Sequence, residues 1–197
     1  MALENKLGLE SSADLDREEE RISKKKAMEL FDKKTLDMLD AGTFSALQAI
    51  HKYLFDEIYE FAGCIRTVNI AKGNFRFAPV MYLESALEHI EKMPQSTFDE
   101  IVEKYVEMNI AHPFREGNGR STRIWLDLIF KTELHKVVDW SKVDKDDYLL
   151  AMERSPIRDI EIKHILKDAL NDEIDSRRIY DYRYYYEGCT TFKTEEL

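Results

Sequence analysis

Twelve consecutive residues, His112 to Arg123, bring together many of the side chains in this sequence that can do chemistry. They read His-Pro-Phe-Arg-Glu-Gly-Asn-Gly-Arg-Ser-Thr-Arg. A histidine can take a proton, a carboxylate can hold a divalent cation, and arginines and glycine amides can bind a phosphate. Each residue taken alone has an ordinary structural explanation, but the combination in one short segment favours a reactive site.

His112 is expected at the end of a helix. Apolar residues recur at helical spacing between Phe98 and Ala111, and Pro113 cannot continue a helix because it lacks a backbone N–H. The imidazole should therefore face a loop. With an ordinary pKa of about 6.5, it can be neutral near pH 7 and act as a general base.

The loop should lead into the N-terminus of a second helix, because an apolar stripe begins at residue 124. The N–H groups and the dipole of such an N-terminus attract anions, and Gly117 and Gly119 let a ligand approach the backbone closely. Arg120 and Arg123 are three residues apart, so they are expected to share a helix face and to bind phosphate oxygens.

Glu116 comes just before this anion site. One carboxylate, together with phosphate oxygens and waters, is a common ligand set for Mg²⁺. We therefore expect a protein hydroxyl, deprotonated by His112, to attack a phosphorus atom held by the loop and the metal. Positioning and charge neutralisation would supply most of the catalysis. Phe114 is expected in the core, where it holds the loop in place.

The motif from His112 to Arg123 resembles the complete signature of the Fic family, His-Pro-Phe-x-(Asp/Glu)-Gly-Asn-Gly-Arg-x-x-Arg. The resemblance extends over about Thr43 to Arg154 and is greatest to small single-domain bacterial Fic proteins. It implies an all-α fold, a Fic-type helical bundle with a short β-hairpin flap, and one domain over residues 1–197 with a core at about 43–154. The implied activity is protein adenylylation, which transfers AMP from ATP to a hydroxyl side chain and releases pyrophosphate.

The resemblance also assigns roles within the motif. His112 becomes the general base and Glu116 the ligand of Mg²⁺ or Mn²⁺. Asn118 would lie near the α-phosphate, Arg120 near the β-phosphate and Arg123 near the γ-phosphate. The implied nucleotide-binding residues are Lys72, Gly73, Glu116, Gly117, Asn118, Gly119, Arg120 and Arg123.

Other activities of the same pocket stay open at this point. Fic relatives that act as kinases carry Lys where this chain has Gly119, so Gly119 favours nucleotidyl transfer. Transfer of another phosphate-linked group, such as phosphocholine, is compatible with the motif. Removal of AMP from modified proteins is a further alternative. A non-catalytic nucleotide-binding regulator is disfavoured, since it would need neither His112 nor Glu116.

A second segment, residues 68–79, is expected to form a hairpin. The Gly73-Asn74 pair favours a turn, and the apolar side chains beyond it alternate with other residues. An exposed hairpin edge can pair with an extended peptide, whereas the alternative is a plain connector between helices. Resemblance identifies the hairpin as a flap that aligns the protein target, with Ile70, Phe75 and Phe77 as docking residues.

A third segment, Tyr184-Tyr185-Tyr186-Glu187-Gly188, resembles the inhibitory motif of one Fic class, with Arg183 at a position where that class has Ser or Thr. The resemblance implies a C-terminal regulatory helix at about 172–188. In it, Glu187 would pair with Arg123 and block the γ-phosphate site. Tyr184, Tyr185 and Tyr186 are candidate sites of self-modification. The alternative is a tail whose tyrosines pack on nearby apolar surface.

The amino-acid composition limits the classes of partner that the protein is expected to bind. The formal net charge of −10 argues against direct binding of nucleic acid. Two cysteines form neither a metal pattern nor a disulfide framework, and neither a membrane span nor a signal peptide is evident, so we expect a cytoplasmic protein without membrane contact. The resemblance adds ATP, a protein target that is a topoisomerase or the protein itself, and assembly into a homo-oligomer.

The remaining pattern is helical. The strongest amphipathic segment begins at Phe44 and should end near Gly63, and His51 within it is expected to be an ordinary helix or core histidine. A charged N-terminal surface helix is expected at about 14–31. Further helices are expected at 81–93, 98–111, 119–135, 146–154 and 159–170.

Overall fold

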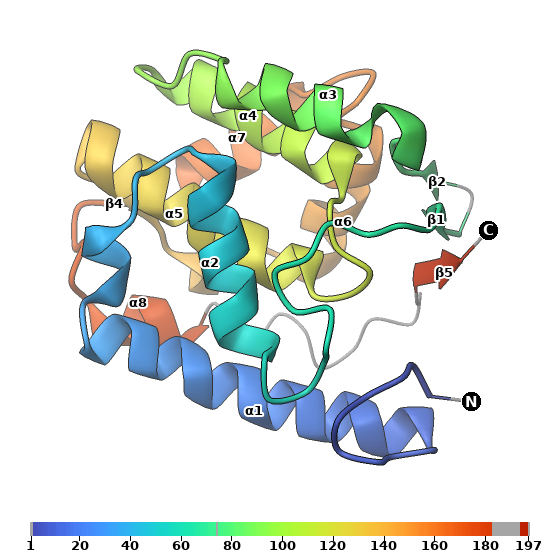
Figure 1. Cartoon of the computed structure of the whole chain (residues 1–197). Coiled ribbons are helices and arrows are strands. Elements are labelled where there is room, and N and C mark those ends of the chain that lie inside the picture. The colour runs from blue at the N-terminus through green and yellow to red at the C-terminus, as the bar shows by residue number, and fades with distance from the viewer. Residues whose placement is uncertain (1, 74, 183–193, 197) are drawn as a thin grey trace.

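The computed structural model describes residues 2–73, 75–182 and 194–196. These residues are mostly helical, with a small sheet at one side (Figure 1). The helices are α1 (Ser12–Asp32), α2 (Phe44–Phe55), α3 (Val80–Glu91), α4 (Phe98–Ala111), α5 (Asn118–Leu134), α6 (Lys145–Arg154), α7 (Ile160–Asp168) and α8 (Arg177–Tyr182), with 3-10 turns η1 (Thr35–Met38) and η2 (Trp140–Lys142). The expected all-α class with a hairpin is confirmed.

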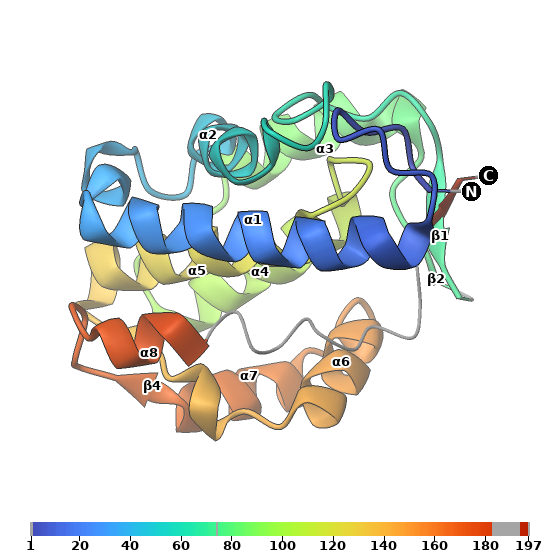
Figure 2. The same cartoon turned by 90° about the horizontal axis from the view of Figure 1, so that it is seen from below.

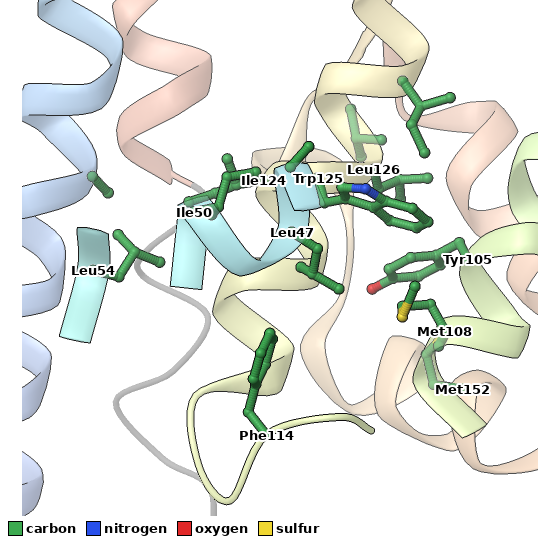
Figure 3. Close-up of a cluster of buried hydrophobic side chains, with 14 of the residues drawn as sticks. Leu47, Ile50, Leu54, Tyr105, Met108, Phe114, Ile124, Trp125, Leu126 and Met152 are labelled. Atoms are coloured by element: carbon green, nitrogen blue, oxygen red, sulfur yellow. The ribbon is translucent and has the colours of Figure 1, made fainter. Parts of the chain in front are cut away.

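α5 forms the centre of the core. It packs against α2 on one side and α4 on another, and its side chains from Ile124 to Phe130 are buried. Figure 3 shows the indole of Trp125 lying between side chains of α2 and α4, with Phe114 of the preceding loop below them. α1 packs against α2 and runs along the outside of the bundle (Figure 2). The helix that follows the motif is therefore held by the most tightly packed part of the protein.

The helix beginnings follow from local sequence. Ser11 and Thr43 accept backbone N–H groups at the starts of α1 and α2. Thr97 and Glu100 form a reciprocal capping box at the start of α4. This cap fixes where α4 begins.

α2 is shorter than the expected helix. It ends at Phe55, and residues 56–63 form turns instead of continuing to Gly63. The chain folds back onto α2: the Gly63 N–H donates to His51 Nδ1 at 2.9 Å, and Gln48 Nε2 donates to the Gly63 carbonyl at 3.1 Å. Ile58 is buried by this turn, so the apolar pattern continues although the helix does not.

The expected hairpin is present as β1 (Ile70–Lys72) and β2 (Phe75–Arg76), while Asn74 of its turn lies outside the described residues. The expectation of an open edge is wrong for β1. A C-terminal strand, β5 (Thr194–Glu196), pairs with it to give the sheet order β2-β1-β5. A second small sheet, β3 (Val137–Val138) with β4 (Leu170–Asn171), was not expected from the sequence.

Of the C-terminal regulatory helix expected at about 172–188, the structure describes only a helix at 177–182, which is α8. Arg183, Glu187 and the tyrosines at 184–186 lie outside the described residues. Within the ranges given above, every helix is too short or too polar to cross a bilayer.

Candidate active site

His112 ends α4 in a left-handed backbone conformation, with φ of 47°, and its N–H donates to the Met108 carbonyl at 3.0 Å. The ring Nδ1 lies 3.2 Å from the carbonyl oxygen of Asn109. Since a carbonyl can only accept, Nδ1 carries the proton, and the lone pair of the neutral ring is then on Nε2. Nε2 is thus the atom that can accept a proton from a substrate.

The environment of His112 favours its neutral form. Burial lowers the pKa of His112 to about 3; the hydrogen bond to Asn109 opposes this shift, and the positive charges of Lys72 and Arg66 add to it. The imidazole is therefore unprotonated at pH 7. A polyphosphate bound nearby would raise this pKa, because negative charge stabilises the protonated ring.

Phe77 lies against this imidazole. The two rings stack with their centroids 3.6 Å apart, and Phe75 meets Phe77 edge to face at 5.1 Å. The side chains of Ile70 and Phe77 are buried, so they are not exposed for target docking in this structure. Phe77 instead orients the imidazole, whereas the side chain of Phe75 is partly exposed.

Arg66 holds the start of the motif loop by hydrogen bonds to backbone carbonyls. Its guanidinium donates to the carbonyls of His112 at 2.8 Å, Val68 at 2.7 Å and Ala111 at 3.1 Å, and also to the carbonyl of Ala78. One buried side chain thus ties the flap to the end of α4. Arg66 could not be predicted from the sequence, because an isolated arginine 46 residues before the motif belongs to no recognisable pattern.

The first turn of α5 lies where the anion site is expected. Gly117 precedes it with φ of 77°, and a Cβ at this position would lie 2.4 Å from the Phe55 ring. Only glycine fits both the backbone conformation and the space. The loop can therefore pass close to α2 while the N–H groups of α5 point out of the helix.

Two buried side chains hold the loop in shape. The Asn118 amide accepts from the Phe114 N–H at 2.9 Å and donates to the Phe114 carbonyl at 2.7 Å. His51 stacks on the Phe114 ring at 3.8 Å, and its Nε2 donates to the Glu116 carbonyl at 2.8 Å, because its Nδ1 accepts from Gly63. The core position expected for Phe114 is confirmed. His51 is a core histidine, as expected, and in addition it supports the loop.

Glu116 has a half-buried side chain whose Oε1 accepts the Gly117 N–H at 3.0 Å. The described residues contain no cluster of three or more side chains that would bind a metal by themselves. A single carboxylate beside a helix N-terminus suits a cation that takes its other ligands from phosphate and water. The donor set therefore fits Mg²⁺ bound together with a nucleotide.

The two arginines of the motif contact different elements. Arg120 donates to Ser23 Oγ at 2.9 Å and forms an ion pair with Glu19, both on α1, and it lies 4.8 Å over the Phe55 ring. The buried Arg123 lies 5.8 Å over the Trp140 ring. Glu19 was not expected near the motif, since the N-terminal helix was interpreted as a charged surface helix.

Comparison with known proteins gives the family. Residues 42–130 match the model of the Fic/DOC family. Residues 42–130 therefore form a domain of this family. The motif that resembles the Fic signature lies at the junction of two helices, α4 and α5.

Similar Fic proteins include the protein adenylyltransferase VbhT of Bartonella schoenbuchensis, 32% identical over 73% of this chain and 31% of VbhT. The probable protein adenylyltransferase y4lH of Sinorhizobium fredii is 29% identical over 64% of this chain and 72% of that protein. The chain thus spans about a third of the length of VbhT.

Solved Fic structures share the fold. The BepC protein of Bartonella tribocorum with bound AMPPNP has a TM-score of 0.72 and 19% identity, covering 87% of this chain and 93% of that one. The N-terminal FIC domain of Bep8 from Bartonella sp. 1-1C has a TM-score of 0.75 and 19% identity, covering 88% and 92%. The helical bundle with its flap is therefore the Fic fold.

Proposed function

We propose that this protein is an adenylyltransferase that transfers AMP from ATP to a hydroxyl side chain of a protein, with the protein itself among the candidate targets. The observation that carries the proposal is the neutral His112, with its lone pair on Nε2, at a loop that leads into the N-terminus of α5. The names of VbhT and y4lH, and the AMPPNP bound to BepC, support it.

In this proposal the triphosphate of ATP lies along the loop. The backbone N–H groups of the first turn of α5 bind phosphate oxygens, and Gly117 and Gly119 allow the close approach. Asn118 acts through its backbone, since its side chain is engaged with Phe114. Lys72 and Gly73 of the flap complete the site, and the charge of Lys72 is near enough to affect the His112 pKa.

The chemistry follows from these positions. The target hydroxyl oxygen forms a bond to the α-phosphorus, and the bond from that phosphorus to the oxygen bridging the β-phosphorus breaks. Pyrophosphate leaves, and the hydroxyl proton moves to His112 Nε2. Mg²⁺ held by Glu116 and the phosphates would supply charge neutralisation.

Arginines complete the neutralisation of the triphosphate. We assign Arg123 to the γ-phosphate end and Arg120 to the β-phosphate. Because Arg120 is held by Glu19 in this structure, it has to share or exchange that partner when a phosphate binds. ATP binding is thus coupled to α1.

The choice of AMP as the transferred group is tested with two labelled nucleotides. The full chain is incubated with a bacterial lysate and Mg²⁺, once with ATP labelled at the α-phosphate and once at the γ-phosphate. We expect protein labelling from the α-label alone, and loss of labelling by at least about 100-fold in His112→Ala, because general base catalysis contributes roughly this much. ATP binding should persist in this variant.

Three results would contradict the proposal. Labelling from the γ-phosphate would indicate a kinase. Undiminished labelling by the His112 variant would exclude the imidazole as the base. Release of AMP from pre-modified proteins, without any labelling, would make removal of AMP the activity.

We also propose that Glu187 restrains the activity by pairing with Arg123. Only the resemblance of the tail to an inhibitory Fic motif supports this part. Glu187→Gly is expected to raise labelling from the α-phosphate. An unchanged rate would contradict inhibition by Glu187.

A further inference from the structure

The edge of β1 that was expected to be open is occupied by the chain's own β5. The pairing is antiparallel, with Ile70 opposite Glu196, Ala71 opposite Glu195 and Lys72 opposite Thr194. Figure 1 shows β5 lying beside β1 at the side of the molecule that carries the flap. A strand added to a sheet edge is also how an extended peptide is bound.

An ion pair fixes the position of this strand. Arg115 Nε lies 2.7 Å from Glu196 Oε1, and Nη2 contacts the same oxygen. The guanidinium also lies 5.4 Å over the Phe61 ring, which holds it in place. Arg115 belongs to the motif loop and immediately precedes Glu116, so a segment paired with β1 touches the loop that holds the candidate catalytic residues.

We infer that β5 is a tethered competitor for the edge of β1 at which a protein target docks, and that Arg115 favours a target segment with a carboxylate in the place of Glu196. This inference rests on the proposed function. It commits the docking edge to β1 and not to β2. It also means that Arg115 recognises one side chain of the docked strand, whereas backbone pairing alone does not depend on the sequence of that strand.

The contacts of β5 suit an occupant that can be displaced. The strand has three residues, and an ion pair between partly exposed groups stabilises by about 1 kcal/mol or less. The covalent link to the rest of the chain raises the local concentration of β5 to the order of millimolar. A target with a longer strand or a better fit can therefore replace β5, whereas peptides that bind the edge weakly cannot.

A reversible disulfide tests the occupancy. Ala71→Cys and Glu195→Cys are introduced together in the full chain, with Cys64→Ser and Cys189→Ser to remove the natural thiols. Directly opposed residues of an antiparallel pair are at a distance that a disulfide can bridge. Neither Ala71 nor Glu195 belongs to the candidate catalytic or nucleotide-binding residues.

We expect the oxidised protein to bind ATP unchanged and to label lysate proteins from α-labelled ATP at least about tenfold less than the reduced protein, since the closed strand can no longer leave. Reductant should restore labelling. Failure of the disulfide to form would overturn the pairing, and equal labelling by the oxidised and reduced forms would overturn the competition.

A peptide tests the role of Arg115. The probe is a fluorescent octapeptide with the sequence of residues 190–197, Thr-Thr-Phe-Lys-Thr-Glu-Glu-Leu, and its anisotropy is measured on the full-length Glu196→Lys variant. Losing its ion pair should loosen β5 in that variant, so the peptide should bind about threefold tighter than to the parent protein. Glu173→Lys, the same charge change in an exposed loop, is the matched control and should bind like the parent.

Reversing the charge of the peptide side chain then tests whether the carboxylate is the group that Arg115 recognises. A peptide with Lys in place of the residue that corresponds to Glu196 should bind the Glu196→Lys variant about threefold more weakly than the original peptide. Adding Arg115→Glu to that variant should reverse the preference. Equal binding of both peptides would overturn the selectivity.

The peptide measurements need neither ATP nor catalysis, so the inference and the proposed function fail separately. If nothing is labelled in any lysate but the peptides behave as expected, the proposed function is wrong and the strand competition stands. If labelling occurs regardless of the disulfide, the inference is wrong and the proposed function stands.

Discussion

Glu19 sets the state of Arg120. It forms an ion pair with Arg120 and accepts a hydrogen bond from the Tyr59 hydroxyl. The side chains of Glu19 and Arg120 are only 9% and 11% exposed. Burial and the neighbouring Glu19 raise the pKa of Tyr59, so its hydroxyl stays a donor. A phosphate that approaches Arg120 therefore competes with a carboxylate that is already well bound.

Glu19→Gln should weaken this competition. The amide oxygen can still accept from Tyr59, but the negative charge is gone, so Arg120 becomes available to a phosphate. We expect the dissociation constant of ATP, measured by calorimetry, to fall by about threefold or more. An unchanged constant would mean that Arg120 keeps its contacts to α1 when the nucleotide binds.

Arg66 should matter for both stability and activity. Arg66→Met leaves buried carbonyls without donors, which typically costs about 1–3 kcal/mol for each group left unsatisfied. We expect a loss of at least about 3 kcal/mol in urea unfolding and a slower transfer step, because the backbone of His112 is no longer held. Arg76→Met, at an exposed position on β2, is the control and should change neither quantity.

Single residues differ in how far the sequence reveals them. The end of α4 at His112 and the buried position of Phe114 follow from local pattern and were predicted. Glu19 and Arg66 could not be found this way, because their importance comes from long-range contacts that no spacing records. A buried charge outside a recognisable motif looks like any surface charge in the sequence.

At the level of elements, the junction of α4 and α5 depends on Gly117. Gly117→Ala would place a methyl group in a left-handed conformation against the Phe55 ring. The two effects cost about 1–3 kcal/mol each, and both should appear in chemical denaturation. The candidate anion site would be distorted as well.

Gly8→Ala isolates the backbone contribution. Gly8 has φ of 69° and open space where a Cβ would lie, so this variant carries conformational strain without the clash. Gly117→Ala should therefore lose more stability than Gly8→Ala, and adding Phe55→Ala to it should recover the part due to the clash in a double-mutant cycle. Equal losses would show that the Phe55 ring moves aside at no cost.

Elements were predicted well where their pattern is long and poorly where it is short. α4 and α5 begin and end within about a residue of the expected positions, since periodicity and caps agree there. The apolar pattern of α2 continues through Ile58, but the turn onto His51 ends the helix at Phe55. β5 has three residues and a partner more than 120 residues away, so no local signal predicts it.

For the whole molecule, buried histidines couple folding to pH. Burial lowers the pKa of His51 to about 4, whereas its ordinary value is about 6.5. Between these values the unfolded chain binds a proton that the folded protein does not, so stability falls as the pH is lowered from about 6.5 toward 4. The effect is up to about 1.4 kcal/mol per pH unit for each such histidine.

Urea unfolding between pH 6.5 and 5 measures this slope, above the range where most carboxylates titrate. His51→Gln should reduce the slope by the share of one histidine, although it also lowers the stability at neutral pH. His164→Gln, at an exposed position, is the control for removing an imidazole and should change the stability at neutral pH little. The same slope in parent and His51 variant would contradict a neutral His51 in the folded protein.

Because α5 lies at the centre of the core, a survey of substitutions along it will mix two kinds of defect. Replacing Trp125 would destabilise the fold, and replacing Arg123 would remove a proposed contact to ATP, yet a growth or labelling screen would score both as inactive. Measuring the folded fraction beside the activity of each variant separates them. Pharmacological screening faces the same ambiguity, since a compound that loosens this helix would pass for an active-site inhibitor.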